Sequence, residues 1–530
     1  MHRLAFACLA LTCASACVDD LDGRSAGDPL SSAEGVQFTI EWDGYVYVPR
    51  GADDGTVKWH MQRQIKSALG ALREAGIGIA DRDAQRFLGA NPVARTPLTV
   101  VDGGATVAEI DRVTYHYRDT ALVDKDLIPT GPFDLTLLFG DYPARRGELV
   151  PACSDDPAAE ADSLWYHFSP RRWDCRSKIT AENAAIGAAT SALASTATQI
   201  ARADYERRFL PSRAVLTPVT GAPELYPEYD KLWGFAGDPA RTMVVVYSFF
   251  GVDSDESNAQ DSGLREYLRF ERTLRARFPG LHVTYTAPQA MLLDFWIDGQ
   301  KLPGITFDMV ERWILDRTGW PAAVGSDAGK RAELERQVID RFSERWIYWQ
   351  LPVQVTDGST ARRMTIELRT FHGLEDGSSD IRLHARWRYL EAFWHGDVFT
   401  YTGHSHFGHG PLEPWDYSGS NFPDRYQVLL FNSCLSFNYY DQDFLDMHPG
   451  GSQQLDVVVN GLAAYWEGMG QATANLVLSL IDGEDKTWRQ VLRAMRVDLP
   501  WQAGYDPMRA VNGELDNQWT ASRPLTVTPQ

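Results

Sequence analysis

Short apolar runs in the second half of the chain restrict its fold more than any other feature. A strand that is buried on both faces of a parallel sheet is apolar along its whole length, because neither face meets water. Helical segments at 264–278 and 383–394 alternate with such runs, which predicts an α/β layered domain with a mainly parallel sheet over residues 241–510. The runs that matter most below occupy residues 244–250, 398–401, 427–431 and 455–459.

The first half of the chain has the pattern of an α+β domain. Apolar and polar residues alternate over 36–48, and Asp43-Gly44 within this stretch predicts the turn of a β-hairpin. Apolar residues at helical spacing predict a helix over 57–75, and an Ala-rich segment predicts another over 181–209. We expect an α+β domain at 36–215, a Pro-rich linker at 216–240 and a tail at 511–530.

Residues 1–17 have the features of an export leader. A basic residue, an apolar stretch and small residues precede Cys17, and the stretch is too short to span a membrane. The segment 14–17 (Ala-Ser-Ala-Cys) resembles a bacterial lipobox, which implies that Cys17 is acylated and begins the mature chain; the alternative is an ordinary signal peptide cut near Ala16. Either predicts export, to the cell envelope (the outer membrane if acylated), the periplasm or the medium. Residues 18–35 are rich in Asp, Gly and Ser and predict a flexible tether.

The charge balance bears on possible partners. The chain has 51 Lys and Arg against 71 Asp and Glu, a formal charge of −20, and no basic run interleaved with aromatic residues. A phosphate backbone would be repelled overall, so we expect no nucleic-acid partner. No later segment is apolar for long enough to cross a bilayer, so a lipid on Cys17 would be the membrane anchor.

Six cysteines divide into four groups. Cys8 and Cys13 leave with the leader, and Cys17 is the candidate lipid attachment site. Cys153 and Cys175 are close in sequence, and in an oxidising compartment we expect them to form a disulfide. Cys434 is then the odd thiol, which is either a buried inert residue or a reactive one.

Two apolar runs end in residues that carry chemistry. His404 follows the run at 398–401, and Cys434 follows the run at 427–431. In parallel sheets, sites form at the carboxyl ends of strands. If the two strands are parallel neighbours, an imidazole and a thiol meet at one edge of the sheet and share one substrate.

These two blocks resemble those of the cysteine peptidase clan that includes caspases, legumains, clostripain and gingipains. In that clan one hydrophobic block ends in His-Gly and another in Ala-Cys or Ser-Cys; here Ser433 precedes Cys434. The gingipain-like pattern of an aspartate-led strand, Tyr, Gly and His is matched by Asp397, Tyr401, Gly403 and His404. The resemblance covers residues 240–500, but its specific part is the two short blocks.

The resemblance implies a caspase-like three-layer domain and a cysteine endopeptidase that needs no cofactor and acts on proteins or peptides outside the cytoplasm. Cys434 would be the nucleophile and His404 the proton donor to the leaving amine. Backbone N–H groups of Ser405 and Cys434 would form the oxyanion hole. The family has Gly where this chain has Ser405, but any residue except proline supplies that N–H.

Two alternatives remain open on sequence alone. The first is a non-catalytic surface lipoprotein that retains a degenerate caspase-like fold. The second is a metal-dependent hydrolase, because His404, His406 and His409 resemble the metal-binding segment of metallo-β-lactamase-fold enzymes. That family has Asp where this chain has Gly408, and His448 is the only later histidine to supply a further ligand.

Tyr465 and Trp466 follow the last of the four apolar runs. They are candidates for lining a specificity pocket, although an aromatic pair in this position is more often part of the core.

Overall fold

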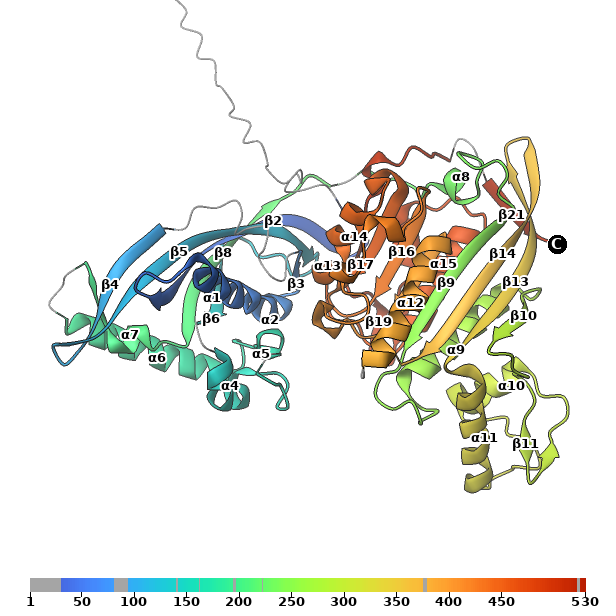
Figure 1. Cartoon of the computed structure of the whole chain (residues 1–530), viewed down its shortest axis with the longest axis horizontal. Coiled ribbons are helices and arrows are strands. Elements are labelled where there is room, and N and C mark those ends of the chain that lie inside the picture. Colours follow the sequence, from blue (N-terminus) through green and yellow to red (C-terminus); the bar gives the residue numbers. More distant parts are fainter. Residues whose placement is uncertain are drawn as a thin grey trace, which may run out of the picture.

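The computed structural model describes residues 30–80, 94–139, 142–161, 163–193, 197–221, 223–374, 379–521 and 525–530. The leader, most of the tether and Cys17 therefore lie outside the described residues. Two large sheets with their helices lie side by side along the long axis of the molecule (Figure 1). The chain is a mixed α/β protein, as the sequence predicts. In the described parts, none of the helices is both long and apolar enough to span a membrane.

The N-terminal sheet has seven strands in the order β6-β8-β2-β5-β4-β7, and β3 pairs with β5. Its long central pair, β2 and β5, is antiparallel. The strands are β2 (Gly35–Pro49), β3 (Ile77–Ile79), β4 (Ala94–Asp102), β5 (Ala105–Asp124), β6 (Phe133–Leu138), β7 (Gln199–Ala201) and β8 (Phe209–Pro218). The helices are α1 (Asp54–Lys66), α2 (Ala68–Arg73), α4 (Arg146–Cys153), α5 (Leu164–His167), α6 (Trp173–Ser191) and α7 (Arg202–Tyr205).

The hairpin predicted at Asp43-Gly44 is wrong. β2 passes through both residues as one strand and pairs with β5 without interruption from Gly35↔Asp124 to Pro49↔Ile110. Gly44 serves packing here instead of a turn, because a Cβ at this position would lie 2.3 Å from Cζ of Tyr115. The helix expected over 181–209 is also too long. α6 ends at Ser191, and β7 begins eight residues later at Gln199.

The C-terminal sheet has ten strands in the order β1-β20-β17-β16-β15-β9-β14-β13-β10, and β21 pairs with β13. The five central strands, β17 to β14 in this order, are parallel, but every pairing outside them is antiparallel. The expectation of a mainly parallel sheet therefore holds only for the centre. The strands are β1 (Ser31–Ser32), β9 (Met243–Gly251), β10 (His282–Ala287), β13 (Arg345–Asp357), β14 (Thr360–Gly373), β15 (Val398–Thr402), β16 (Gln427–Asn432), β17 (Leu455–Asn460), β20 (Arg509–Asn512) and β21 (Leu525–Pro529).

Helices cover both faces of this sheet. Alternate residues of β16 belong to different apolar clusters: Leu429 and Phe431 pack with α12 and α14, whereas Val428 and Leu430 pack with α9, α15 and α16. The domain thus has three layers, helix, sheet and helix. The helices are α8 (Tyr229–Leu232), α9 (Ser262–Arg277), α10 (Phe307–Glu311), α11 (Ala328–Phe342), α12 (Ser379–His395), α13 (Ser436–Tyr439), α14 (Asp441–Met447), α15 (Met469–Ile481) and α16 (Trp488–Ala494). Two small two-stranded sheets, β11 (Trp296–Ile297) with β12 (Gln300–Lys301) and β18 (Val497–Leu499) with β19 (Gln502–Tyr505), complete the domain.

Both ends of the described chain join the C-terminal sheet. Ser31 and Ser32, placed by sequence in a tether, form β1 and pair with β20. The expected tail at 511–530 contains β21, which pairs with β13 from Val353↔Pro529 to Asp357↔Leu525. These segments are too short for an alternation of apolar and polar residues to be recognised in the sequence. They form strands because the edges of the sheet offer them unpaired N–H and C=O groups as hydrogen-bond partners. The expected linker likewise begins inside β8 and contains α8.

Candidate functional site

The candidate site lies at the carboxyl ends of three neighbouring parallel strands. In register, Thr402 of β15 pairs with Asn432 of β16 and with Phe250 of β9. His404 and Cys434 each come two residues after this row. The adjacency and direction of β15 and β16, on which the sequence argument depended, are therefore present, and both side chains emerge at one edge of the sheet.

His404 is held by the loop that follows the third of these strands. Its Nε2 lies 3.0 Å from the carbonyl oxygen of Asp253 and 3.6 Å from Asp253 Oδ1. On its other side, the ring meets Trp466 edge-on at 5.5 Å between centroids. The imidazole thus has a carboxylate and a carbonyl to orient it, and it remains partly open to solvent, as proton transfer to a substrate requires.

Asp253 is the site residue that sequence reasoning missed. It follows β9 by two residues, in a loop rich in Asp and Ser, and its own N–H donates to Asp261 Oδ1 at 3.0 Å. Asp261 also caps α9 by accepting from the N–H of Gly263. Its position was the signal available in the sequence. Asp253 follows the apolar strand β9, just as His404 follows β15 and Cys434 follows β16.

Cys434 is the free thiol of the described chain, and it keeps partial exposure to solvent. Its Sγ lies 3.5 Å from the carbonyl oxygen of Ala464, in the loop after β17. Burial raises the pKa of the thiol, and backbone hydrogen bonding at Ala464, the Tyr166 hydroxyl and the charge of Arg73 oppose that rise. Tyr166 and Arg73 belong to the N-terminal domain.

A buried polar network holds the strand ends. Asn432 Nδ2 donates to Thr473 Oγ1 at 3.1 Å, and that hydroxyl is 2.9 Å from the hydroxyl of Thr402. Asn460 Nδ2 donates to Asn432 Oδ1 at 3.1 Å and to the carbonyl of Ser433 at 3.0 Å. The ends of β15, β16 and β17 are thereby linked to α15, which positions the backbone directly before Cys434.

The backbone next to both candidate residues is strained. His406 and Phe407 have φ values of 49° and 54°, and Leu435 has a φ of 51°. Bulky residues avoid this left-handed region, and conformations of this kind cluster at functional sites. Within the described residues, no carbonyl accepts from the N–H of Ser405 or of Cys434.

The three clustered histidines do not come together as a metal site. The rings of His404 and His406 are 5.9 Å apart between centroids, and His409 Nδ1 is 3.0 Å from Glu413 Oε1. His404 and His409 thus contact different acidic residues. Over the ranges that the structure describes, no group of three His, Cys, Asp or Glu side chains is arranged to hold a metal ion.

The expected disulfide between Cys153 and Cys175 is confirmed, with 4.7 Å between the two Cα atoms. It links the end of α4 to the start of α6. The four residues of α5, which include Tyr166, lie between the two cysteines in the chain.

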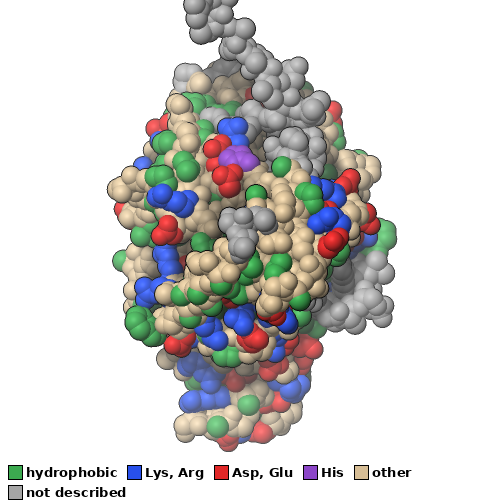
Figure 2. All heavy atoms as spheres, turned by 90° about the vertical axis from the view of Figure 1, so that its left-hand side faces the viewer, with side chains coloured by type: hydrophobic (Ala, Val, Ile, Leu, Met, Phe, Trp, Pro, Cys, Tyr) green, Lys and Arg blue, Asp and Glu red, His purple; other side chains and the backbone are tan. Residues whose placement is uncertain are grey.

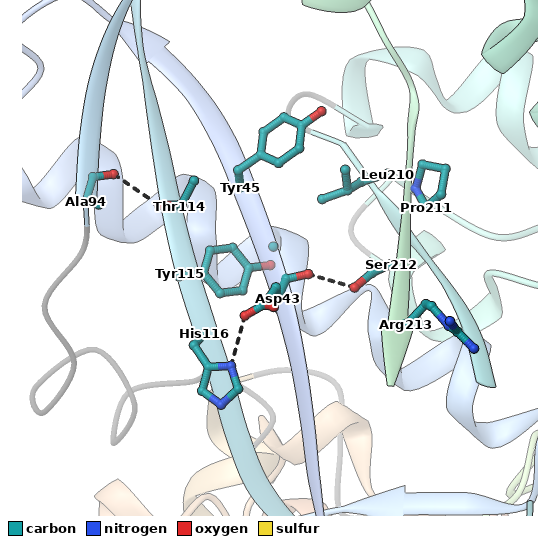
Figure 3. A pocket seen from close by; sticks show the side chains of 11 residues that line it. Asp43, Tyr45, Ala94, Thr114, Tyr115, His116, Leu210, Pro211, Ser212 and Arg213 are labelled. Carbon is teal, nitrogen blue, oxygen red and sulfur yellow. Dashed lines mark hydrogen bonds and ion pairs between the residues drawn. The ribbon is translucent and has the colours of Figure 1, made fainter. Parts of the chain in front are cut away.

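An open hollow lies in the N-terminal domain, and neither His404 nor Cys434 is among the residues that line it. It has a volume of about 630 Å³ and is bordered by β2, β5 and β8. Figure 3 shows His116 turned toward Asp43, and the His116 Nδ1 to Asp43 Oδ1 distance is 2.9 Å. Ser212 Oγ donates to the Asp43 carbonyl at 2.7 Å. These polar groups satisfy one another and converge on no common point.

The outer end of the N-terminal domain has no charged patch of one sign among the described residues in view. Acidic and basic side chains are interspersed across it (Figure 2). The ion pair between Arg202 and Asp102 is about half exposed. A surface of this kind is typical of a solvated face.

No family model, no curated protein and no solved structure matches this chain. The geometry of the site and the sequence blocks that form it are therefore the basis for a function.

Proposed function

We propose that this protein is a cysteine endopeptidase of the caspase and gingipain type, with Cys434 as nucleophile and His404 as acid and base. The observation that carries the proposal is the position of both residues two places beyond one row of paired residues on neighbouring parallel strands. A three-layer domain with helices on both faces of the sheet is consistent with a caspase-like fold.

The reaction can be written with these groups alone. The thiol of Cys434 passes its proton to His404, and the sulfur adds to the carbonyl carbon of the scissile peptide bond. The N–H groups of Ser405 and Cys434 donate to the oxyanion. The C–N bond breaks as His404 returns the proton to the leaving nitrogen, and water then hydrolyses the thioester and regenerates the thiol.

Among the described residues, no hydrogen bond joins His404 to Cys434. The proton transfer from Cys434 would therefore need the two side chains to approach each other when substrate binds. Asp253 would hold His404 in the orientation needed and would stabilise the imidazolium form.

The test is cleavage of a peptide library by the chain from residue 18 onward. We expect Cys434→Ala to abolish cleavage and His404→Ala to reduce it by a factor on the order of 10³ or more, with the fold intact by circular dichroism. His406→Ala and His409→Ala serve as matched controls and should cost far less, and chelators should leave activity unchanged. If Cys434→Ala cleaves peptides at the wild-type rate, the peptidase proposal is wrong.

One observation favours a second candidate, a non-catalytic lipoprotein with a degenerate site. The pKa of the Cys434 thiol is raised by burial, whereas reactive cysteines usually have a lowered pKa. An electrophilic probe distinguishes the two, because a competent nucleophile is labelled rapidly at neutral pH and labelling is prevented in Cys434→Ala. A thiol that stays unlabelled until the protein is unfolded would favour the scaffold.

We also propose that the protein is exported and anchored in the cell envelope by a lipid on Cys17. The basis is the leader and its lipobox-like end. Cys17→Ser should move the protein from the membrane fraction to the soluble fraction, and retention in the membrane would contradict the anchor.

A further inference from the structure

We propose that the N-terminal domain is a permanent part of the active site, because it holds the loop that carries His404 through the ring of Phe407. This histidine loop, residues 403–410, follows β15 directly. Phe407 is a positioning residue, since it acts on the reaction only by keeping His404 in place. The inference rests on the proposed peptidase function and gives the N-terminal domain a part in it.

The backbone of the histidine loop has an unfavourable conformation over three successive residues. His406, Phe407 and Gly408 have φ values of 49°, 54° and 77°. Left-handed backbone costs free energy for residues with a side chain, and it persists only where the surroundings hold it. Within the loop, the N–H of Gly408 donates to the carbonyl of Ser405 at 2.7 Å, and the N–H of His409 donates to the carbonyl of His406 at 3.0 Å. These two bonds close the turn, but they do not attach it to the rest of the protein.

The aromatic side chains of α5, in the N-terminal domain, attach the turn. The Phe407 ring meets the Trp165 ring at 5.7 Å between centroids and an interplanar angle of 67°. It meets the Tyr166 ring at 5.2 Å and 70°. Both partners are buried, and edge-on aromatic pairs are favourable beyond the area that they bury. The N-terminal domain thus contacts the loop at one of its strained residues.

The segment that presents these two rings is itself fixed. The disulfide of Cys153 with Cys175 closes the stretch of chain that contains α5. The N–H of Ser169 donates to the carbonyl of Cys153 at 2.8 Å. The Lys66 ammonium lies 4.2 Å from the centre of the Trp165 ring, which links that ring to the end of α1. The contact with Phe407 is therefore made by a well-supported part of the N-terminal domain.

The start of the histidine loop is held by its own domain. The hydroxyl of Tyr401 donates to the carbonyl of His404 at 2.6 Å, and the hydroxyl of Tyr440 donates to the carbonyl of Ser405 at 2.8 Å. The left-handed residues follow Ser405, and Phe407 is the one among them that contacts α5. If that contact is lost, we expect the strained residues to relax and to move the backbone of His404 and Ser405.

The interface between the domains has the features of a permanent one. A Cβ on Gly78 of β3 would lie 2.3 Å from the carbonyl oxygen of Gly461, so the two backbones touch where no side chain fits. Asn438 Nδ2 donates to the carbonyl of Ile79 at 2.8 Å, and Asn438 is buried. Leu122 packs there as well, and a single apolar cluster runs through both domains.

The chain path also opposes release of the N-terminal domain. β1 pairs in the C-terminal sheet before β2 begins the N-terminal one, so the domain is connected to the larger sheet at both of its ends. A detachable cover would more simply hang from one connection. This geometry favours a permanent support of the site over a removable inhibitor.

The first experiment removes the contact without changing the domain that carries the dyad. In the chain from residue 18 onward, we expect Trp165→Leu to lower kcat for a cleaved peptide about tenfold and to leave KM close to the wild-type value, because His404 moves while the groups that bind substrate stay in place. Phe407→Leu tests the same contact from the other side, at a half-buried position, and should have the same effect. Phe407→Tyr keeps the ring and should keep kcat within a factor of about two.

Hydrogen exchange reports on the histidine loop without any substrate. In Trp165→Leu we expect the amides of residues 403–410 to exchange about tenfold faster, because the N–H groups of Gly408 and His409 lose protection when the turn opens. The buried strand β16 is the internal reference and should exchange at the wild-type rate. Mass spectrometry of the chain from residue 18 onward measures both segments.

Phe139→Leu is the matched control. The Phe139 ring is buried in the N-terminal domain and meets the Tyr45 ring at 5.7 Å and 67°, the same geometry as the pair of Trp165 with Phe407. Both members of this control pair belong to the N-terminal domain. The variant loses a comparable aromatic contact and should leave kcat and the exchange of the histidine loop unchanged.

The outcomes separate this inference from the function on which it rests. Wild-type kcat and wild-type loop exchange in Trp165→Leu would overturn the inference. Faster cleavage in that variant would make the N-terminal domain an inhibitory cover and would overturn it as well. If the wild type cleaves no peptide, faster loop exchange in Trp165→Leu but not in Phe139→Leu still supports the attachment of the loop, and the peptidase proposal alone fails.

Discussion

The two domains differ in the pKa values of the carboxyl groups that they contain. Among the described residues of the N-terminal domain, the carboxyl groups of Asp53 and Asp155 have lowered pKa values, because hydrogen bonds or charged partners stabilise their ionised forms. In the C-terminal domain, burial raises the pKa of Asp456, Glu271 and Glu311 to about 7. The C-terminal domain thus buries three acids with raised pKa values, beside exposed acids such as Asp255 and Glu333 whose pKa values are lowered by hydrogen bonds.

The contrast shows which domain contains the buried acids and backbone conformations that cost folding free energy. The three acids with raised pKa values and the positive φ values at His406 and Leu435 all belong to the domain with the candidate dyad. The N-terminal domain instead has a disulfide, and its hollow is lined by polar groups that satisfy one another. Strain and desolvation are characteristic of sites that act on a ligand, and solvated pairs are characteristic of surfaces.

The largest expected effect concerns the cross-link of the N-terminal domain. Replacing Cys153 and Cys175 together by Ser removes a bond between residues separated by 22 positions, and we expect a loss of about 3 kcal/mol in the free energy of unfolding. Urea unfolding followed by tryptophan fluorescence measures the loss. An unchanged urea midpoint would mean that the domain does not depend on its disulfide.

The second prediction concerns pH and the buried acid Asp456. Its Oδ2 accepts from Asn517 Nδ2 at 3.0 Å and from the hydroxyl of Tyr426, and burial raises its pKa to about 7. Since the folded state holds this proton more tightly than the unfolded state does, its contribution to stability is greatest at low pH and is lost as pH rises toward 7.

Asp456→Asn removes this ionisation and keeps the shape of the side chain. We expect the free energy of unfolding of the variant, relative to that of the wild type, to be about 2 kcal/mol higher at pH 8 than at pH 5. Chemical unfolding at both pH values measures this change. Glu271→Gln is a parallel variant with the same expected sign, because burial raises that pKa as well. If the difference in the free energy of unfolding between variant and wild type does not change with pH, Asp456 does not have a raised pKa in the folded protein.

The third prediction concerns the orientation of His404. Asp253→Ala removes the carboxylate that lies 3.6 Å from Nε2, and we expect kcat/KM to fall about tenfold, because the backbone carbonyl at 3.0 Å remains. Peptide cleavage by purified variants measures this. Asp255→Asn, in the same loop but away from His404, is the control and should retain activity. Equal losses in both variants would point to the loop as a whole instead of the Asp253 carboxylate.

Sequence reasoning succeeded where a residue sits in a strong local pattern. The apolar strands β15 and β16 and the residues that follow them could be predicted, because a buried parallel strand has an unmistakable composition. The pairing of Cys153 with Cys175 followed from their spacing and from export. The hairpin failed because Asp-Gly signals a turn only where the chain is free to bend, and the neighbouring β5 holds this one straight.

The rest of the site depends on contacts between distant parts of the chain. The N-terminal domain packs on the C-terminal domain where β3 docks on the backbone of Gly461, and no local pattern specifies that contact. The strands β1 and β21 were missed for the same reason, since partners far along the chain make them strands. Asp253 had a usable signal in its position after β9, but an acidic loop residue is ordinary by itself.

The smallest expected effect tests whether the hollow of the N-terminal domain is only a surface. Asp43→Asn and His116→Gln change two side chains that are 89% and 54% exposed, whose pairing is screened by water. We expect both variants to keep peptide cleavage within a factor of about two and the free energy of unfolding within about 0.5 kcal/mol. Ser212→Ala, which removes only the hydroxyl bonded to the Asp43 carbonyl, is the matched control.

A measurable effect of His116→Gln on peptide cleavage would change the comparison between the two domains. If His116→Gln raised KM for long peptides but not for short ones, the hollow would be a remote binding surface for substrate, because only a long chain can reach both regions. The N-terminal domain would then contribute to substrate binding through His116. With equal KM values for long and short peptides, the chemistry of this protein is confined to the strand ends where His404 and Cys434 lie.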